Sequence, residues 1–314
     1  MMNYYNYDIN ILPLKDFYSL KNIWLTLEKN RSIFSSFMWK KAFIESFYNK
    51  EYYFALLFEK NIIKIILPFQ INNNIIQIIG TPRSDYNELL GNYNFEQVNF
   101  LLCYLKNKYK KYNFVLSDIL LNDSFKFLLK SQDYMVSKAS LVHKINLDQI
   151  DSIFKKEAIL RKTKKIYREN LKIEYKIIRN KNEIFFYLEK LFFLHKKKWN
   201  KTSTPSQFED KKNILLYYNL TKNLNIENIQ MNILFIENNV SAIHFGFIFN
   251  NNFYYYKPIY DEEYFEYSPG ILLIAYIISN LKIDNIKIFD FLRGNEDYKK
   301  RYSNIIDYTY KVIF

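Results

Sequence analysis

The chain has 314 residues, of which 49% are hydrophobic and 19% aromatic, so it is long enough for two folded domains and too apolar to be disordered. A net charge of +13 raises nucleic acid as a partner, but the chain is also rich in Asn, Ile, Lys and Tyr, which have AT-rich codons. Codon bias therefore accounts for much of the lysine excess, and we expect no nucleic-acid partner from charge alone. One cysteine, Cys103, excludes an internal disulfide and a thiol-rich metal site.

The N-terminal stretch MMNYYNYDIN has neither a basic n-region nor an apolar h-region, and no apolar run reaches the roughly 18–20 residues of a membrane span. We therefore expect a protein of the bacterial or organellar cytoplasm. The three histidines, His143, His195 and His244, lie far apart and no HExxH motif is present, so we expect no metal site. The sequence leaves the oligomeric state open.

The first half of the chain alternates helical and strand-like patterns. Polar turns at Glu59-Lys60-Asn61 and Asn72-Asn73-Asn74 divide an apolar stretch into three strands, and a loop bracketed by Gly80 and Gly91 follows. In chain order we expect a helix over 37–47, three strands within 52–80, a helix over 95–109, a strand over 113–116, another helix, and a strand near 140–145.

A basic segment then separates the two halves, with Glu157 the single acid among seven basic residues. Its apolar positions recur at partly helical spacing. Two interpretations stay open: a solvated helix that bridges the halves, or a basic rim that faces an anionic substrate. The basic residues are Lys155, Lys156, Arg161, Lys162, Lys164, Lys165 and Arg168.

The second half repeats the order of the first, which predicts an α/β or α+β fold made by duplication, with domains over 1–150 and 151–314. Sequence identity between the halves is too low to establish a repeat. The expected elements are a strand over 172–178, helices over 183–199 and 214–224, strands over 231–237, 240–249 and 253–259, a helix over 268–281, a strand over 286–292, a short helix from about 296, and a strand over 308–313.

The stretch EYSPGILL contains one of only 5 glycines in the chain. Ser268 suits a helix N-cap, Pro269 the first helical position and Gly270 the second, while Ile271 leaves no capping-box acid to occupy the free N–H groups. The stretch is therefore either a plain helix start or a phosphate site, because an unshielded helix N-terminus attracts anions.

A second cluster, DFLRGNEDYKKRY, follows at residues 290–302. Asp290, at the end of an expected strand, is either a buried, paired carboxylate or a reacting one. The charged residues of this cluster could instead form internal ion pairs, Arg293 with Glu296 or Asp290 with Lys299, and this structural role is as plausible from the sequence as a role in the reaction.

Together, YYYKPIYDEEYFEYSPGILL and DFLRGNEDYKKRY resemble the signature of CelD-like acyltransferases, GNAT-superfamily proteins named for cellulose and other polysaccharide biosynthesis and related to Fem-type transferases. FLHKKKW (193–199), LRKTKKIYREN (160–170) and IIGTPRSDYNELL (78–90) resemble further segments of that family. The resemblance implies a tandem duplicated GNAT fold with mixed sheets flanked by helices. Its N-terminal half would recognise the acceptor, and its C-terminal half would bind acetyl-CoA or another acyl-CoA at Ser268, Pro269, Gly270 and Ile271. The family's longer Gly-rich loop is reduced here to Ser-Pro-Gly.

The resemblance implies acyl transfer to an amine, with an amino sugar or sugar nucleotide of cell-surface polysaccharide biosynthesis as the small-molecule acceptor. Such transfer needs a base and a group that stabilises the oxyanion or the leaving thiolate. No Ser-His-Asp order is apparent, so we expect direct attack. The base would be Asp290 or Glu296, with His195 behind them, and Tyr298 would serve the oxyanion or thiolate. Substrate contacts would come from Arg83, Ser84, Asp85, Tyr86, Trp199, Arg293 and Lys299.

Two other functions stay open. A Fem-type aminoacyltransferase would take its amino acid from charged tRNA, which the basic segment would suit, although no heptad pattern predicts the coiled-coil arm of that group. A non-catalytic scaffold of polysaccharide synthesis would need neither Asp290 nor an open helix N-terminus.

Overall fold

The computed structural model describes residues 7–48, 51–120, 126–130, 133–152, 163–284 and 286–314. The chain forms two compact units: unit 1 comprises Met1–Leu141 and Asp307–Phe314, and unit 2 comprises Val142–Ile306. The start of the basic segment, with Lys155, Lys156, Arg161 and Lys162, lies outside the described residues, and 163–168 are helical.

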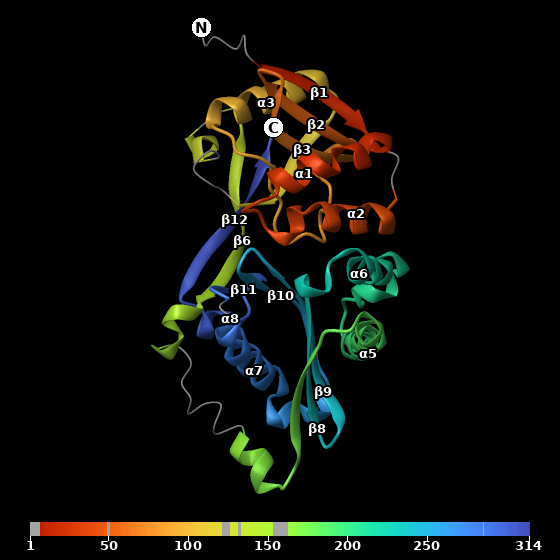
Figure 1. Cartoon of the computed structure of the whole chain (residues 1–314), viewed down its shortest axis with the longest axis vertical. Coiled ribbons are helices and arrows are strands. Elements are labelled where there is room, and N and C mark those ends of the chain that lie inside the picture. Colours follow the sequence, from red (N-terminus) through yellow and green to blue (C-terminus); the bar gives the residue numbers. More distant parts are fainter. Residues whose placement is uncertain (1–6, 49–50, 121–125, 131–132, 153–162, 285) are drawn as a thin grey trace. The chain divides into compact units, whose positions relative to one another are not determined.

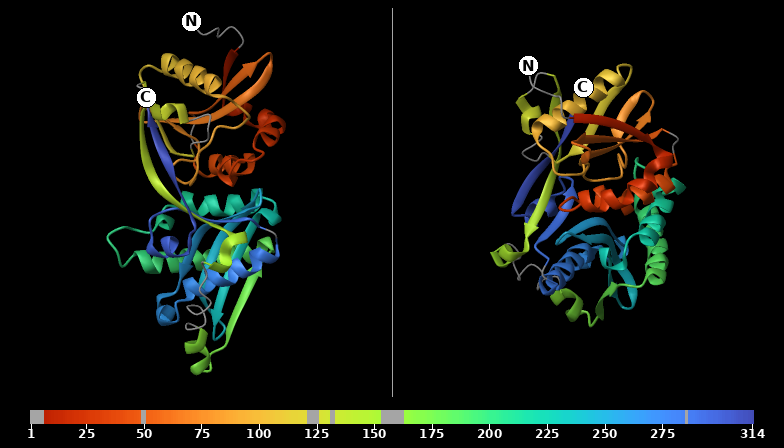
Figure 2. Two further views of the ribbon diagram at one scale, coloured as in Figure 1. Left: turned by 90° about the vertical axis from the view of Figure 1, so that its left-hand side faces the viewer. Right: turned by 45° about the horizontal axis from the view of Figure 1, so that its top comes forward.

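Unit 1 is built around a mixed sheet (Figure 1). Its strand order is β1-β2-β3-β4-β5-β12, and the paired strands run antiparallel except β4 and β5, which are parallel. Figure 2 shows the last strand, drawn in blue, beside the strands of this unit. The elements are β1 (Tyr7–Pro13), α1 (Lys21–Leu27), α2 (Phe37–Ser46), β2 (Tyr52–Glu59), β3 (Ile62–Asn72), β4 (Ile75–Ile78), α3 (Phe95–Lys108), β5 (Asn113–Ile119) and β12 (Ile305–Ile313).

Side chains alternate across this sheet, so each strand contributes to two cores. On β2, Phe54 stacks on Phe17, with ring centroids 5.3 Å apart, and contacts Trp24 of α1 edge-on. The next residue, Ala55, belongs to the apolar cluster that α3 covers through Leu101 and its neighbours. Both faces of the sheet are therefore buried by helices.

The strands of unit 2 follow in the order β6-β11-β10-β9-β8-β7, in which only β10 and β11 are parallel. Helices α5 and α6 cover one face and α7 the other (Figure 1). The elements are β6 (Met135–Asn146), β7 (Ile173–Ile178), α5 (Lys181–Trp199), α6 (Lys211–Asn223), β8 (Ile229–Ile236), β9 (Asn239–Phe249), β10 (Asn252–Tyr260), α7 (Pro269–Ile283), β11 (Ile288–Arg293) and α8 (Asp297–Tyr302).

Each unit contains a three-stranded meander followed by a helix and a parallel strand: β2-β3-β4, α3 and β5 in unit 1, and β8-β9-β10, α7 and β11 in unit 2. Four two-residue turns join the meander strands, at 60–61, 73–74, 237–238 and 250–251, and all eight residues have φ between 48° and 63°. Such left-handed pairs form the type I′ turns that match strand twist. Asparagine supplies six of these residues, in the role that glycine plays in most hairpins.

The predicted α/β pattern is confirmed, and the two turns predicted in the first half lie where they were expected. One prediction was wrong: between 116 and 140 the described residues contain a short 3-10 helix, Lys126–Lys130, in place of an α-helix. The sequence prediction also missed β1 and α1. Helix α1 has only 7 residues and buries a single large side chain, Trp24, so its apolar periodicity is too short to detect.

Candidate active site

A pocket in unit 2 opens where β10 and β11 separate. The two strands pair only over Asn252–Tyr254 and Ile288–Asp290. Immediately beyond, β10 carries an extra residue against β9 between Tyr254 and Lys257, and β11 carries one against β6 between Asp290 and Arg293. Such bulges bend a strand away from its neighbour, so the two bulges explain why the parallel strands part here.

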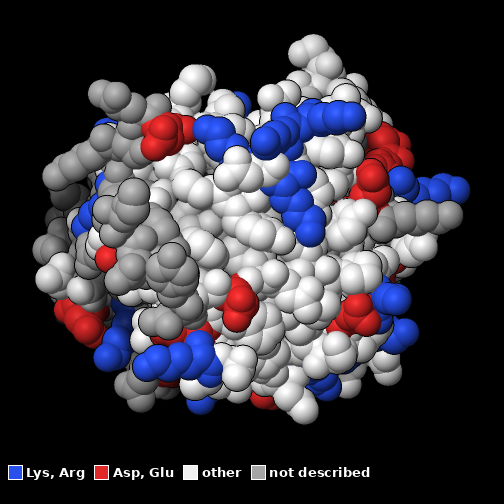
Figure 3. Space-filling model, turned by 90° about the horizontal axis from the view of Figure 1, so that it is seen from above, with Lys and Arg blue, Asp and Glu red and all other residues white. Residues whose placement is uncertain are grey.

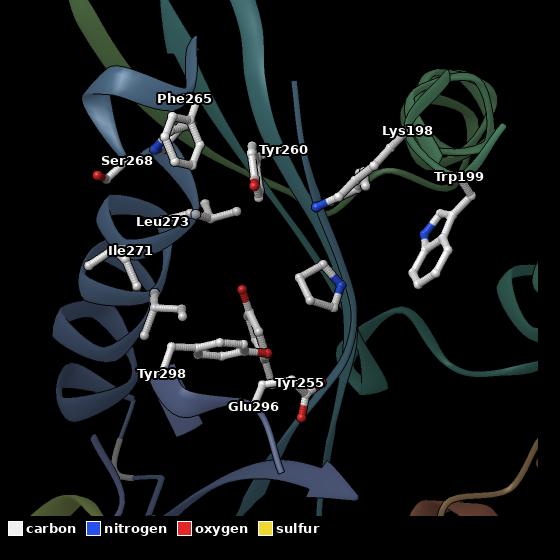
Figure 4. Close-up of a pocket in the computed structure, with 15 residues that line it drawn as sticks. Lys198, Trp199, Tyr255, Tyr260, Phe265, Ser268, Ile271, Leu273, Glu296 and Tyr298 are labelled. Atoms are coloured by element: carbon white, nitrogen blue, oxygen red, sulfur yellow. The ribbon is translucent and has the colours of Figure 1, made fainter. Parts of the chain in front are cut away.

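The pocket has a volume of about 470 Å³ (Figure 4). It lies between the end of β10, the start of α7, the last turn of α5 and the segment that leads into α8. Among the described residues that line it, only Lys198 and Glu296 are charged. The lining residues are Lys198, Trp199, Tyr255, Pro258, Ile259, Tyr260, Phe265, Ser268, Pro269, Gly270, Ile271, Leu273, Ile274, Glu296 and Tyr298.

The N-terminus of α7 forms one wall of the pocket, and all four predicted donor-binding residues line it. Ser268 stands at the N-cap position but is left-handed, with φ of 53°, and its side chain makes no capping hydrogen bond, so its predicted capping role was wrong. Its carbonyl instead accepts from the N–H groups of Ile271 and Leu272, at 3.0 and 3.2 Å. Because Pro269 has no N–H, Gly270 carries the first amide N–H of the helix.

Gly270 faces open space. A Cβ built on it would meet only Cδ1 of Tyr260, at 3.6 Å, which is an ordinary contact. Its backbone is not in the left-handed region, so neither sterics nor dihedral angles require glycine for folding. The missing side chain therefore leaves room beside the first N–H of α7.

Glu296 reaches the pocket from the segment before α8 and is held by a lysine. Its carboxylate lies 3.0 Å from Nζ of Lys299, which is almost completely buried and also donates to the carbonyl of Arg293 at 2.6 Å. Both side chains fold over Gly294, whose φ is 136°. Lys299 thus pairs with Glu296 and not, as one sequence alternative had it, with Asp290.

Two tyrosines lie beside this carboxylate. Burial, with Glu296 as the second cause, raises the pKa of Tyr298 above its ordinary value. Burial raises the pKa of Tyr255 in the same direction, and Tyr298 adds to it. Both hydroxyls therefore keep their protons at neutral pH and are available as proton donors.

Asp290 does not line the pocket. It is 3% exposed, its Oδ1 accepts the N–H of Leu292 at 2.8 Å, and its Oδ2 lies 3.9 Å from Nζ of Lys144. Leu292 has a φ of 63°, a strained value for a branched residue. The carboxylate of Asp290 therefore stabilises the bulge in β11 that opens the pocket.

His195 is also absent from the pocket lining. It is 7% exposed on α5, its Nδ1 lies 2.8 Å from Oγ of Ser206, and its ring contacts Phe208 and Trp199. Burial, with Lys257 and Lys198 as lesser causes, lowers the pKa of His195 to about 4. Of the predicted residues on this helix, Trp199 lines the pocket and His195 does not.

His195 predicts a pH dependence of stability. Its pKa is about 4 in the folded protein and about 6.5 when exposed, so the unfolded chain binds the extra proton first as the pH falls. Stability from this group is complete above pH ~6.5 and is lost between pH ~6.5 and ~4, by on the order of 2 kcal/mol. We expect His195→Gln to be less stable than the wild type at pH 7 but to lose less on acidification, as measured by urea unfolding at each pH. Equal losses in both proteins would contradict this.

The predicted acceptor loop of unit 1 is partly a core segment. Ser84 is fully buried and its Oγ accepts from Nε1 of Trp39 at 3.0 Å, and Tyr86 is 1% exposed. Arg83 and Asp85 are half-buried and remain nearer the surface. Beside the loop, Lys40 is completely buried, its Nζ donates to the carbonyl of Ile79, and burial lowers its pKa to about 7.

The sequence prediction missed eight pocket residues: Lys198, Tyr255, Pro258, Ile259, Tyr260, Phe265, Leu273 and Ile274. The three aromatic residues among them lie within the stretch YYYKPIYDEEYFEY, where their type alone did not distinguish pocket from core. The other two predicted substrate contacts, Arg293 and Lys299, stand next to the pocket in sequence but are not among the residues that line it.

Two other kinds of feature are not found in the described part of the chain. It contains no helix long and apolar enough to cross a lipid bilayer. It also contains no group of three or more His, Cys, Asp or Glu side chains arranged to hold a metal ion.

Residues 155–300 match the acetyltransferase (GNAT) domain family, and this segment includes every residue that lines the pocket. This segment of unit 2 is therefore similar to GNAT-type acetyltransferase domains. The GNAT part of the resemblance drawn from the sequence is thereby confirmed, and its CelD-like part remains a proposal. No curated protein sequence matches the chain.

The fold is similar to that of solved structures over most of the chain, as three examples show. L-PGS from Bacillus licheniformis is 12% identical, with a TM-score of 0.56 over 88% of this chain and 90% of that one. FemX is 9% identical, with a TM-score of 0.60 over 96% of each chain. A tandem GNAT protein from the clavulanic acid biosynthesis pathway is 7% identical, with a TM-score of 0.51 over 97% of this chain and 98% of that one. At these identities the likeness concerns the fold alone, and it confirms the predicted duplicated architecture.

Proposed function

We propose that this protein is an acyl-CoA-dependent N-acyltransferase that binds its donor, acetyl-CoA or another acyl-CoA, in the pocket of unit 2. It transfers the acyl group directly to the amine of a small-molecule acceptor. The observation that carries this proposal is one cavity that combines the open N-terminus of α7 at Gly270 with Glu296 and Tyr298 on another part of its wall.

The start of α7 fits a phosphate group of the donor. The helix has 15 residues, so its N-terminus carries the partial positive charge that attracts anions, and Gly270 offers an N–H with open space beside it. The segment just before the helix is acidic, but its carboxylates are paired: Glu262 with Lys201 at 2.7 Å, Glu263 with Lys197 at 2.6 Å, and Glu266 with Lys165. These pairs reduce the repulsion that the segment would otherwise exert on a phosphate.

Glu296 and Tyr298 supply the two proton transfers of direct attack. The acceptor nitrogen bonds to the thioester carbonyl carbon, and Glu296 takes the ammonium proton. The carbon–sulfur bond then breaks, and the O–H of Tyr298 gives its proton to the departing thiolate. Lys299 keeps the carboxylate of Glu296 in place through their 3.0 Å pair.

The proposal also includes the chemical class of the acceptor. The CelD-like resemblance supports an amino sugar or sugar nucleotide of cell-surface polysaccharide biosynthesis, in the cytoplasm. In unit 2 a contact to it would come from Trp199, which lines the pocket, whereas in unit 1 the burial of Ser84 and Tyr86 makes these two residues part of the core.

The Fem-type alternative, with charged tRNA as donor, depends on a basic surface. In the described part of the basic segment, Lys165 pairs with Glu266 and with Glu169, so it is engaged within the protein. On the face shown in Figure 3, basic and acidic side chains are interspersed around uncharged surface. The pairing of Lys165 favours acyl-CoA over tRNA as the donor.

Donor binding is tested by thermal shift with acetyl-CoA, CoA and charged tRNA. A ligand present at 100 times its Kd stabilises a protein by about 2.7 kcal/mol, so binding is readily measured. We expect acetyl-CoA and CoA to raise the Tm of the wild type, and Gly270→Val to abolish that shift because its side chain fills the space beside the first N–H of α7.

The matched control is Ser279→Val, which adds the same β-branched side chain at an exposed position of the same helix and should keep the full shift. If no CoA species at millimolar concentration stabilises the wild type, the proposal is wrong. A shift with charged tRNA alone would support the Fem-type function instead.

A further inference from the structure

The last turn of α5 and the loop after it carry four lysines, of which three are paired with carboxylates. Lys196 lies 3.7 Å from Glu209, and Lys197 and Lys201 hold the acidic segment before α7. Lys198 differs. Its Nζ lies 4.2 Å from the ring centroid of Tyr260, and it lines the pocket. Its charge acts on Glu262, whose carboxylate pairs with Lys201, but the described residues include no carboxylate in ion-pair contact with Lys198.

Figure 4 shows the side chain of Lys198 reaching from α5 into the cavity towards Tyr260. Most of the other lining residues are aromatic or aliphatic. A cation over an aromatic ring is stabilised by the ring electrons, but the mainly apolar side chains around this half-buried ammonium offer few of the acceptors that an anion would supply. A methionine at this position would pack against Tyr260 as well, without that cost.

We propose that Lys198 binds an anionic group of a substrate, a phosphate or a carboxylate, inside the pocket. This inference rests on the proposed function and extends it to a residue that fixes substrate class. Tyr260 contacts both Lys198 and the space beside Gly270, so an anion at the start of α7 lies within the same part of the cavity. Glu296, on a different wall, is the pocket's only other charged residue among those described.

The ammonium of Lys198 and the carboxylate of Glu296 therefore both face the acyl donor and the amine acceptor when these are bound in the pocket. An anionic group has two possible sources: the phosphates of the CoA donor, or an acidic substituent on the amine acceptor. In both cases the charge of Lys198 orients the substrate while Glu296 acts on the amine, so loss of the charge should weaken binding and leave the maximal rate nearly unchanged.

The test compares Lys198→Met with Lys196→Met, its neighbour that pairs with Glu209. Calorimetry gives Kd for CoA and for S-acetyl-pantetheine, which lacks phosphate, and steady-state kinetics gives KM for glucosamine and for glucosamine 6-phosphate. A charge-assisted hydrogen bond contributes about 1.5–3 kcal/mol, so we expect Lys198→Met to weaken binding of the anionic probe by about 10–100-fold.

The pattern identifies the source of the anion. Weaker binding of CoA with unchanged binding of S-acetyl-pantetheine assigns Lys198 to the donor, whereas a higher KM for glucosamine 6-phosphate alone assigns it to the acceptor. Lys198→Arg should retain most of the affinity, and Lys196→Met all of it. Equal effects of Lys198→Met on charged and uncharged probes, or no effect, would overturn the inference. A wild type that binds no CoA at all would contradict the proposed function instead.

Discussion

Replacing Glu296 by glutamine should lower kcat by about 10²–10³-fold, because an amide cannot take the proton of the attacking ammonium. The amide is nearly isosteric with the carboxylate and still accepts a hydrogen bond from Lys299, so the pocket should keep its shape. We therefore expect the Kd for acetyl-CoA to change little. Single-turnover kinetics and calorimetry measure the two quantities separately.

Asp290→Asn is the matched control for this prediction. Asparagine keeps an oxygen that can accept the N–H of Leu292, which Asp290 accepts at 2.8 Å, so the bulge should persist and most of the turnover should remain. If Asp290→Asn instead loses as much kcat as Glu296→Gln at unchanged Tm, then Asp290 acts on the reaction and the assignment of Glu296 as sole base fails. If Glu296→Gln keeps full turnover, it is not the base.

The order of helices and strands could be predicted because each element carries its own local pattern. The strand pair around Asn73-Asn74 and the helix after Ser268 are examples in which turn residues and apolar periodicity agree. The elements that could not be predicted depend on contacts remote in sequence. β1 pairs with β2 across the 38 residues from 14 to 51 and has no distinctive pattern of its own.

The residues of the candidate site also fall into those that a local sequence signal predicts and those that depend on contacts remote in sequence. The donor end was predictable because Ser-Pro-Gly at a helix start is a local signal, and its residues do line the pocket. Asp290 was a candidate because it ends a strand, but a bulge decides what such a side chain faces, and bulges depend on the neighbouring strand. Lys198 was missed because helical spacing does not show that the end of α5 reaches the opening between β10 and β11.

Replacing Gly294 by alanine should damage both stability and turnover, whereas the same change at Gly270 should be tolerated by the fold. Gly294 has a φ of 136°, and a Cβ there would overlap the carboxylate of Glu296 and lie 2.5 Å from Nζ of Lys299. Backbone strain of this kind costs on the order of 1–3 kcal/mol. Relief of the overlap requires the ion pair to move, which takes the proposed base out of position.

Gly270→Ala provides the comparison, since its Cβ meets only Tyr260 at 3.6 Å and alanine has the higher helix propensity. We expect its Tm to equal or slightly exceed that of the wild type. Gly294→Ala should have a lower Tm. Its kcat, measured below that Tm, should be reduced at least 10-fold because the carboxylate of Glu296 is displaced from its catalytic position. Wild-type Tm and kcat in Gly294→Ala would show that the Glu296–Lys299 pair has room to shift without loss. In that case the geometry over Gly294 would not be what positions the base.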